Sequence, residues 1–381
     1  MGILRTIFAL AVVFAHLPLC GGLVFVGGRN AVQLFYIISG FLISYVLTER
    51  GGYSNFSTFY LSRWLRLYPI YFVILCLTFL VYLAENSDFF NLYRNIPLAA
   101  DIALVTVNSF LFGQDWIMFS GVENGSLTFM ADFTKSDFQL WRGLLVPQAW
   151  TLGVEMSFYL IAPFVLPRRR LTVALLLCSL SLRGILIYEG FGGHDPWTYR
   201  FFPNELAFFL IGSLVHQILL PLYKKMLGAR IESLSCVATC ILILCSVFYF
   251  VVPVSSVYKT SVLFLFFILF LPLTFIFQNK NGLDRKIGDL SYPIYIGHFL
   301  VIYLTDIYFK RLGISDELVI TIASVVLSVV LAVGLNRIIG DRVESMRGKL
   351  KRRAVKKIDP LPDESMDQLE IGPAQILSRQ K

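Results

Sequence analysis

The feature that most constrains this chain is a series of long apolar runs, which recurs from the first residues almost to the end. A helix that crosses about 30 Å of hydrocarbon needs about 20 mostly apolar residues. Repetition at this length predicts an all-α fold, a polytopic bundle of membrane-spanning helices. The candidate runs are 3–20, 31–48, 67–84, 96–113, 152–167, 171–188, 203–222, 234–253, 260–277, 291–309 and 317–339.

The composition excludes several other classes of protein. Of the 381 residues, 56% are hydrophobic and only 15% are charged, against about 45–50% and about 25% in soluble domains. A soluble enzyme, a disordered chain and a disulfide scaffold are therefore excluded. The net charge of +8 does not indicate a nucleic-acid partner, because the basic residues form short clusters between the apolar runs. The six cysteines lack the paired spacing of a zinc site, so we expect no metal.

The basic clusters predict the orientation of the chain, since Lys and Arg favour cytoplasmic loops. All of them face the cytoplasm only if the run 96–113 does not cross the membrane. We therefore expect about ten transmembrane helices plus one re-entrant or interfacial segment, 96–113, with both termini cytoplasmic. The run 3–20 is expected to be a retained span, because the bulky Leu19 before Cys20 does not suit signal-peptide cleavage. The clusters are Arg50/Arg63/Arg66, Arg168–Arg170, Lys224/Lys225/Arg230, Lys280/Arg285/Lys286 and the residues after Gly340.

Two regions outside the runs divide the chain further. Residues 1–345 are expected to form the membrane domain, and 346–381 a basic, partly disordered cytoplasmic tail. The stretch 114–150 is the one long segment between apolar runs, and we expect it outside the membrane. A loop of this length in a compact bundle is commonly functional.

Two ionisable residues inside the runs are candidates for catalysis, since charged groups are costly there. His16 lies in the first run and is either a hydrogen-bonded structural residue or a general base. Glu155 lies one turn into the fifth run. It either stabilises the start of that helix or orients a catalytic histidine. On the predicted orientation both lie in the outer half of the bilayer, where they could share one cavity.

A pair of arginines is the corresponding candidate at the cytoplasmic side. Arg63 and Arg66 are three residues apart and share one face of a helix. They are either ordinary interfacial anchors, with Trp64 and Tyr68 beside them, or a clamp for an anion such as a phosphate. His298, in the run 291–309, has Ser291, Tyr292 and Tyr295 nearby and can be structural.

Five local motifs, in order along the chain, resemble the acyltransferase-3 family of integral membrane acyltransferases. They reach from the first run to the last but one, and their shared order makes the resemblance specific. The motifs are Leu4-Arg5-Thr6 with Val13-Phe14-Ala15-His16, then Leu34-Phe35-Tyr36-Ile37-Ile38-Ser39-Gly40-Phe41-Leu42-Ile43, then Arg63-x-x-Arg66 with Tyr68-Pro69, then Trp150-Thr151-Leu152-x-x-Glu155-x-x-Phe158-Tyr159, and Ser291-Tyr292-Pro293-Ile294-Tyr295-x-x-His298.

The second motif departs from the family pattern. The family commonly has an aspartate before its paired aromatic residues, where this chain has Gln33, and Tyr36 replaces the second phenylalanine. This difference bears on the type of acceptor more than on the chemistry.

The resemblance implies transfer of an acyl group, most often acetyl from acetyl-CoA, to a hydroxyl of a carbohydrate or lipid-linked glycan. It implies an integral protein of the bacterial inner membrane. His16 is then the expected base and Glu155 its partner, with Arg63, Arg66 and Tyr68 at the donor. Residues expected to contact substrate or support the site are Ser39, Trp150, Tyr159, Ser291, Tyr292, Tyr295 and His298.

Two alternatives from other classes remain open at this point. A transporter or flippase of a glycolipid or small solute would also be a polytopic bundle with scattered polar residues. A membrane scaffold is the other alternative, and the joint presence of His16, Glu155 and the arginine pair disfavours it. The sequence does not distinguish acetyl from succinyl transfer, and it does not indicate the acceptor or the oligomeric state.

Overall fold

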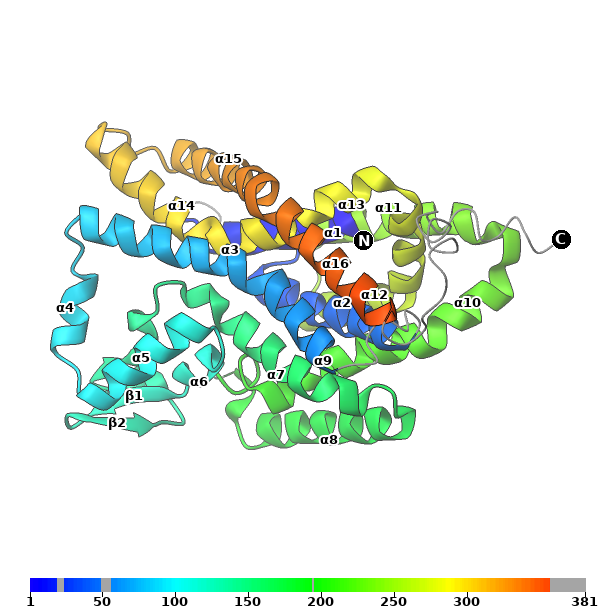
Figure 1. The fold of residues 1–381 in the computed structure, drawn as a ribbon, viewed down its shortest axis with the longest axis horizontal. Helices are drawn as coiled ribbons and strands as arrows, with labels where there is room; N and C mark the ends of the chain where they lie inside the picture. The colour runs from blue at the N-terminus through cyan, green and yellow to red at the C-terminus, as the bar shows by residue number, and fades with distance from the viewer. Residues whose placement is uncertain (19–23, 49–55, 194, 357–381) are drawn as a thin grey trace.

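The computed structural model describes residues 1–18, 24–48, 56–193 and 195–356, with side chains described up to residue 350. Within these ranges the chain is mainly helical (Figure 1). The helices of the first half are α1 Gly2–Ala15, α2 Gly28–Thr48, α3 Phe56–Ala84, α4 Phe89–Arg94, α5 Leu98–Phe110, α6 Gln114–Ile117, α7 Trp150–Val165 and α8 Arg169–Tyr188. Those of the second half are α9 Phe202–Leu214, α10 Leu220–Leu227, α11 Ile231–Val247, α12 Ser256–Lys280, α13 Gly282–Asp289, α14 Ser291–Arg311, α15 Glu317–Leu335 and α16 Asp341–Lys356.

The membrane class of fold is confirmed, whereas the count of about ten spans is not. Seven helical stretches of the described chain are long and apolar enough to cross a membrane. The stretch Phe202–Val247 counts once, because a π-helical turn and a 3-10 turn keep α9, α10 and α11 continuous. Helices α1 and α7 have only 14 and 16 residues. At 1.5 Å per residue they are shorter than the hydrocarbon layer.

The segment 96–113 also forms a short helix. Helix α5 has 13 residues and begins after Pro97, which leaves it too short to cross by length alone. Its end is turned by Leu111, which has a positive φ of 65°. The expected re-entrant or interfacial position of this segment stays a prediction.

A small β-sheet orders part of the segment 114–150 and is the main departure from an all-α chain. Strand β1, Ser120–Glu123, pairs antiparallel with β2, Ser126–Phe129, and with β3, Phe138–Gln139. The tight turn between β1 and β2 contains Gly125, which has a positive φ of 71°. The strand order is β2-β1-β3, so part of the segment between α6 and α7 folds into a three-stranded sheet.

Helices α2 and α9 approach each other more closely than side chains allow. A Cβ atom placed on Gly40 would lie 1.9 Å from the Phe209 carbonyl oxygen, and one on Gly212 would lie 1.9 Å from that of Ile37. Small residues at helix contacts in membranes permit such approach of the backbones. The contact fixes α2, which carries Ser39 beside Gly40.

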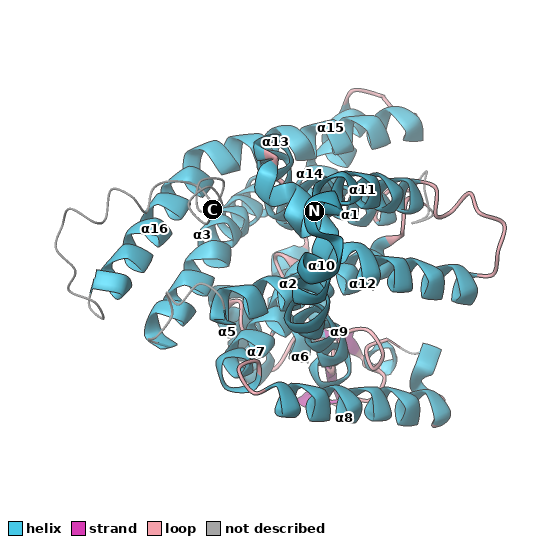
Figure 2. Cartoon of the chain, turned by 90° about the vertical axis from the view of Figure 1, so that its right-hand side faces the viewer, coloured by secondary structure: helices cyan, strands magenta, loops and turns pink. Residues whose placement is uncertain are grey.

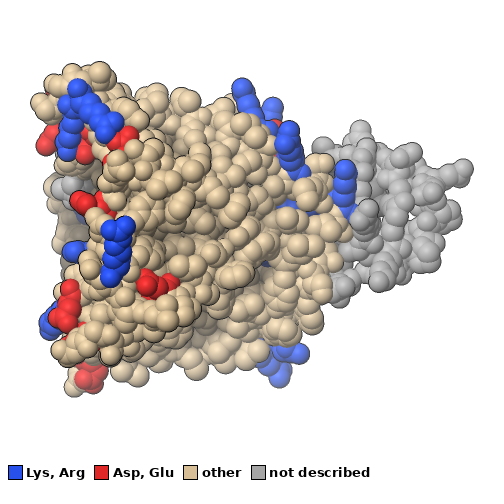
Figure 3. Space-filling model, turned by 60° about the vertical axis from the view of Figure 1, so that its left-hand side comes forward, with Lys and Arg blue, Asp and Glu red and all other residues tan. Residues whose placement is uncertain are grey.

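The long helices run in roughly one direction, with α8 and α15 at opposite edges of the bundle in two perpendicular views (Figures 1 and 2). The β-strands with α4 and α5 lie at one end of the molecule, and α10 lies at the other (Figure 1). Charged residues gather at both ends and leave a broad uncharged band between them (Figure 3). Such a band is the surface expected to face lipid.

Helix α16 continues the last long helix beyond the expected end of the membrane domain. A π-helical turn, Asn336–Gly340, joins α15 to α16 without a break. Arg347 is buried against helix α3, where its Nε donates to the Ser62 hydroxyl at 3.3 Å. The expected boundary at 345/346 therefore falls inside a packed helix. The rest of the expected tail, 357–381, lies outside the described residues.

Candidate active site

Two adjoining cavities occupy the middle of the bundle and one end of it. The inner one, here called the central cavity, has a volume of about 110 Å³. The outer one, here called the vestibule, has a volume of about 460 Å³. They share five lining residues, which makes them neighbouring parts of one path into the protein: Arg5, Leu42, Arg63, Arg66 and Tyr292.

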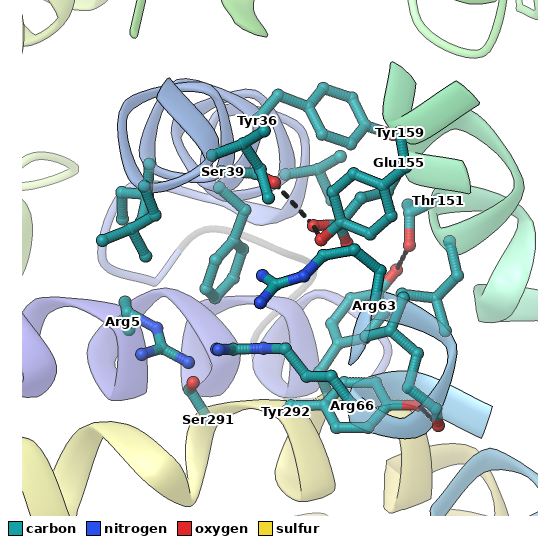
Figure 4. Close-up of a pocket in the computed structure, with 18 residues that line it drawn as sticks. Arg5, Tyr36, Ser39, Arg63, Arg66, Thr151, Glu155, Tyr159, Ser291 and Tyr292 are labelled. Carbon is teal, nitrogen blue, oxygen red and sulfur yellow. Dashed lines mark hydrogen bonds between the residues drawn. The ribbon is translucent and has the colours of Figure 1, made fainter. Parts of the chain in front are cut away.

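Three arginines from two helices surround the central cavity. Arg5 comes from α1, and Arg63 and Arg66 come from one face of α3, a turn apart. Their guanidinium groups converge in the close-up view (Figure 4). Arg63 is only 4% exposed and Arg5 only 8%. Among the described residues, none of the three forms an ion pair, and the Arg63 Nε has no hydrogen-bond partner.

A partly buried cluster of positive charge is costly, because the guanidinium groups have lost water and nearby carboxylates such as Glu155 compensate them only in part. Arg5 and Arg66 lie close enough for their charges to repel. Such an arrangement is stable when an anion enters the cavity, and guanidinium groups bind phosphate through paired hydrogen bonds. The cavity is therefore suited to an anionic ligand.

Glu155 lines the same central cavity as the arginines. Its Oε1 accepts a hydrogen bond from the Ser39 hydroxyl at 2.6 Å and another from the Tyr159 hydroxyl (Figure 4). Ser39 and Tyr159 also line the cavity. These contacts from α2 and α7 orient the carboxylate and explain why Ser39 and Tyr159 occur in the motifs. They do not require Glu155 to stabilise the start of its helix.

His16 lies immediately after α1, at the other side of Tyr295 from the arginines. It is exposed, and its ring stacks on that of His298 with centroids 5.4 Å apart. His16 also contacts the Phe299 ring, at 4.6 Å. Contrary to our expectation that they share a cavity, Glu155 lines the central cavity and His16 is not among the residues that line it.

His298 is fully buried, and its contacts set its orientation. Its Nδ1 lies 2.6 Å from the backbone carbonyl oxygen of Tyr295, so it is Nδ1 that carries the proton and donates. The Nε2 atom then carries a lone pair, and it has no partner among the described residues. The histidine pair was not foreseen from the sequence, because 282 residues separate its members.

Tyr295 separates the histidine pair from the central cavity. It lines that cavity, and its ring lies 6.0 Å from that of His298. Its hydroxyl is held by the Thr151 hydroxyl at 2.7 Å and by the Gln148 carbonyl oxygen at 2.8 Å.

Two further members of the late motif are placed at the cavity. The Ser291 hydroxyl donates to the Gly288 carbonyl oxygen at 2.7 Å. The Tyr292 hydroxyl donates to the Leu67 carbonyl oxygen at 2.5 Å and so ties α14 to α3 beside the arginine pair. Both residues line the central cavity.

Tyr68 and Trp150 lie away from the cavities. Neither is among the residues that line them. The Tyr68 hydroxyl donates to the Ser109 carbonyl oxygen at 2.9 Å, which joins α3 to α5. The Trp150 ring packs under the guanidinium of Arg200, 4.4 Å from its centre, and against Tyr199. These contacts give Tyr68 a packing role and place Trp150 beside the loop before α9.

Sequence reasoning did not assign Arg5 to the site, although it quoted the motif that contains it. A basic residue close to an amino terminus is usually an anchor, and it was interpreted only as part of that motif. The available signal was its position inside an apolar run, where a charge is costly. Glu205 was also missed, and its carboxylate contacts Gln33, the residue at which this chain departs from the family pattern.

Gln33 donates to both carboxylate oxygens of Glu205 at 3.3 Å. Glu205 is fully buried and pairs with Arg183 at 2.7 Å. An aspartate at position 33 would set a second carboxylate against Glu205, whereas the amide supplies a donor. The substitution is therefore consistent with the local charge balance.

The fold and the site define an integral membrane protein with an arginine-lined internal cavity beside a carboxylate. A family model described as an acyltransferase domain matches residues 1–337. The chain therefore belongs to the acyltransferase-3 family.

The relatives in this family carry related names. A Staphylococcus aureus protein named "Putative O-acetyltransferase" is 25% identical over 336 residues, which cover 80% of this chain and 51% of that protein. A Bacillus subtilis protein named "Putative peptidoglycan O-acetyltransferase" is 23% identical over 309 residues, or 73% of this chain and 45% of that one. An uncharacterised Haemophilus influenzae protein is 24% identical over 200 residues, 48% of this chain and 73% of its own. This chain thus spans about half the length of the named O-acetyltransferases. No solved structure matches it.

Proposed function

We propose that this protein is a membrane O-acyltransferase that takes an acyl group from a cytoplasmic acyl-CoA, most simply acetyl-CoA, and transfers it to a hydroxyl of a cell-surface or lipid-linked carbohydrate. One observation carries the proposal: three guanidinium groups, which form no ion pair among the described residues, converge on a cavity that Glu155 also lines. Family membership supplies the reaction class.

The donor end of the site has a charge that suits coenzyme A. Phosphates of the donor would bind Arg5, Arg63 and Arg66, which neutralises the cluster. The uncharged pantetheine arm suits the remaining lining of the central cavity, which is largely aromatic and aliphatic. The thioester would then approach Tyr295, and behind it the histidine pair.

The proposed reaction uses His16 as the base. Its imidazole takes the proton of the acceptor hydroxyl, the oxygen attacks the thioester carbonyl carbon, and the C–S bond breaks. The proton then passes to the departing thiolate, so the base is regenerated. Stacking on His298 orients the His16 ring, and Glu155 supplies negative charge on the donor side.

The proposal places the protein in the bacterial inner membrane with both termini cytoplasmic. The proposed donor requires this orientation, because acyl-CoA is a cytoplasmic compound and Arg5 lies near the amino-terminal end of α1. The acceptor then approaches from the opposite side, at the end that bears the β-strands. A glycolipid transporter would need no such base.

The test is acyl transfer from labelled acetyl-CoA by membranes that contain the protein, with mass analysis of the glycan fraction for an acetyl-sized increment. A positioned base contributes about 10²–10⁴-fold in rate, so His16→Ala should lower turnover on that scale at equal expression. The control is Lys135→Gln, an exposed charge on the segment 114–150. Unchanged turnover in His16→Ala would show that His16 is not the catalytic base. Solute flux without acyl transfer would favour a transporter.

A further inference from the structure

The vestibule has a wall that the acyltransferase family match does not include. The match ends at residue 337, whereas α16 begins at Asp341 and contributes four residues to the vestibule. The turn that precedes it contributes Asn336 and Gly340. A helix that was expected to be the start of a cytoplasmic tail is therefore part of the path to the central cavity.

Helix α16 is held against α3, the helix that carries Arg63 and Arg66. Arg347 is 5% exposed and bonds to Ser62 on α3, the residue directly before Arg63. Arg347 also pairs with Glu344, one turn earlier on α16. The position of α16 is thus coupled to the pair Arg63 and Arg66.

The turn between α15 and α16 is a π-helical turn, and such turns are frequent at functional sites. A Cβ atom placed on Gly340 would lie 2.2 Å from the Asn336 Oδ1 atom, so a side chain at position 340 would displace the Asn336 amide. Asn336 lines the vestibule together with Gln278 and Asn279 from α12.

The charges of the vestibule are mixed, with an excess of arginines over acidic residues. Five arginines and three acidic residues line it. Arg5, Arg63 and Arg66 lie at its inner end, shared with the central cavity, while Arg285 and Arg347 come from α13 and α16. Arg285 is held by a hydrogen bond from its Nη2 to the Asn279 carbonyl oxygen at 3.2 Å.

We propose that the vestibule binds the nucleotide end of the acyl-CoA donor, with Arg285 and Arg347 contacting its terminal phosphate and α16 forming one wall of that site. This rests on the proposed function, since it extends the donor from the central cavity outwards. The amide side chains of the wall can hydrogen-bond to a nucleobase, because each amide both donates and accepts. Guanidinium groups bind phosphate through paired hydrogen bonds, and at Arg347 a phosphate would take the place of Glu344.

The test measures binding, which does not depend on turnover. The full-length protein in phosphatidylcholine nanodiscs is titrated with CoA, with dephospho-CoA, which lacks the 3′-phosphate, and with adenosine 3′,5′-bisphosphate. The wild-type protein should bind CoA at least about tenfold more tightly than dephospho-CoA, as expected for loss of a charge-assisted contact. Arg285→Gln and Arg347→Gln should lose this preference and bind the bisphosphate more weakly.

Matched controls are available on the same two helices. Lys286 and Arg342 are exposed and line neither cavity. Lys286→Gln and Arg342→Gln should therefore keep the preference for CoA over dephospho-CoA. Since Arg347 also holds α16, Arg285→Gln keeps the test decisive if Arg347→Gln fails to fold.

Three results would overturn the inference. Binding of CoA with its preference unchanged in Arg285→Gln would place the nucleotide elsewhere and leave the proposed function standing. Loss of bisphosphate binding in nanodiscs of phosphatidylglycerol would assign the site to an anionic lipid headgroup. Absence of CoA binding by the wild-type protein would refute the proposed function as well.

Discussion

At the scale of single residues, Tyr295 is the side chain that separates the arginine-lined cavity from the histidines. Removing its hydroxyl, in Tyr295→Phe, deletes the bonds to Thr151 and Gln148 and keeps the ring. Each such bond contributes about 1 kcal/mol, so after loss of both the ring should leave this position roughly thirtyfold more often. We expect hydrolysis of acetyl-CoA without acceptor to rise by about that factor. A rate of hydrolysis equal to wild type would show that Tyr295 does not limit access.

Asp115 gives a second residue-scale prediction, outside the spanning segments. It is buried under α7, its Oδ1 has no partner among the described residues, and burial raises its pKa to about 7. The folded protein therefore binds a proton that the unfolded chain has lost, between about pH 4 and pH 7. Stability should fall as the pH rises through this range.

Asp115→Asn should abolish this pH dependence and raise the melting temperature above pH 7, where the wild-type carboxyl is charged. Thermal unfolding in detergent from pH 5 to pH 8 measures the effect. Glu123→Gln, on an exposed strand position, is the control that should keep the wild-type slope. A slope unchanged in Asp115→Asn would contradict the assignment.

At the scale of elements, the contact between α2 and α9 positions the site. A side chain on Gly40 would collide with the Phe209 carbonyl, so Gly40→Ala must push the two helices apart. Overpacking of this kind costs about 1–3 kcal/mol, and Ser39 would move away from Glu155. We expect a lower melting temperature and lower turnover.

The control for this substitution is Gly184→Ala on α8, where a Cβ atom would meet nothing within 4 Å. Alanine is favoured over glycine inside a helix by about 0.5–1 kcal/mol, so Gly184→Ala should be neutral or slightly stabilising. Equal effects of the two substitutions would argue against close packing at Gly40.

The elements also show what sequence could predict. The cost of a charge inside an apolar run pointed to Glu155, and the spacing of two arginines on one helix face pointed to Arg63 and Arg66; all three line the central cavity. The β-sheet was not predicted, because β1 to β3 are two to four residues long and lie in a polar segment. The contact between His16 and His298 and the place of α16 in the wall of the vestibule were not predicted either. Both depend on packing between distant segments, for which local spacing carries no signal.

At the scale of the whole molecule, the orientation in the membrane can be tested directly. The end with the β-strands should face outwards, and the end with α10 should face the cytoplasm. In a cysteine-free background, an impermeant maleimide should label Ser126→Cys in intact cells. It should label Lys225→Cys only after permeabilisation. The opposite pattern would invert the bundle and remove the donor site from the cytoplasmic side.

The central claim is that one path through the molecule carries the donor from the vestibule to the histidines. A cryo-electron microscopy map of the protein with CoA measures this most directly. We predict density for the nucleotide beside α16, phosphate density at Arg5, Arg63 and Arg66, and the sulfur atom at Tyr295 on the side facing His16. Density for CoA outside these cavities, or a sulfur atom that points away from Tyr295, would contradict the account.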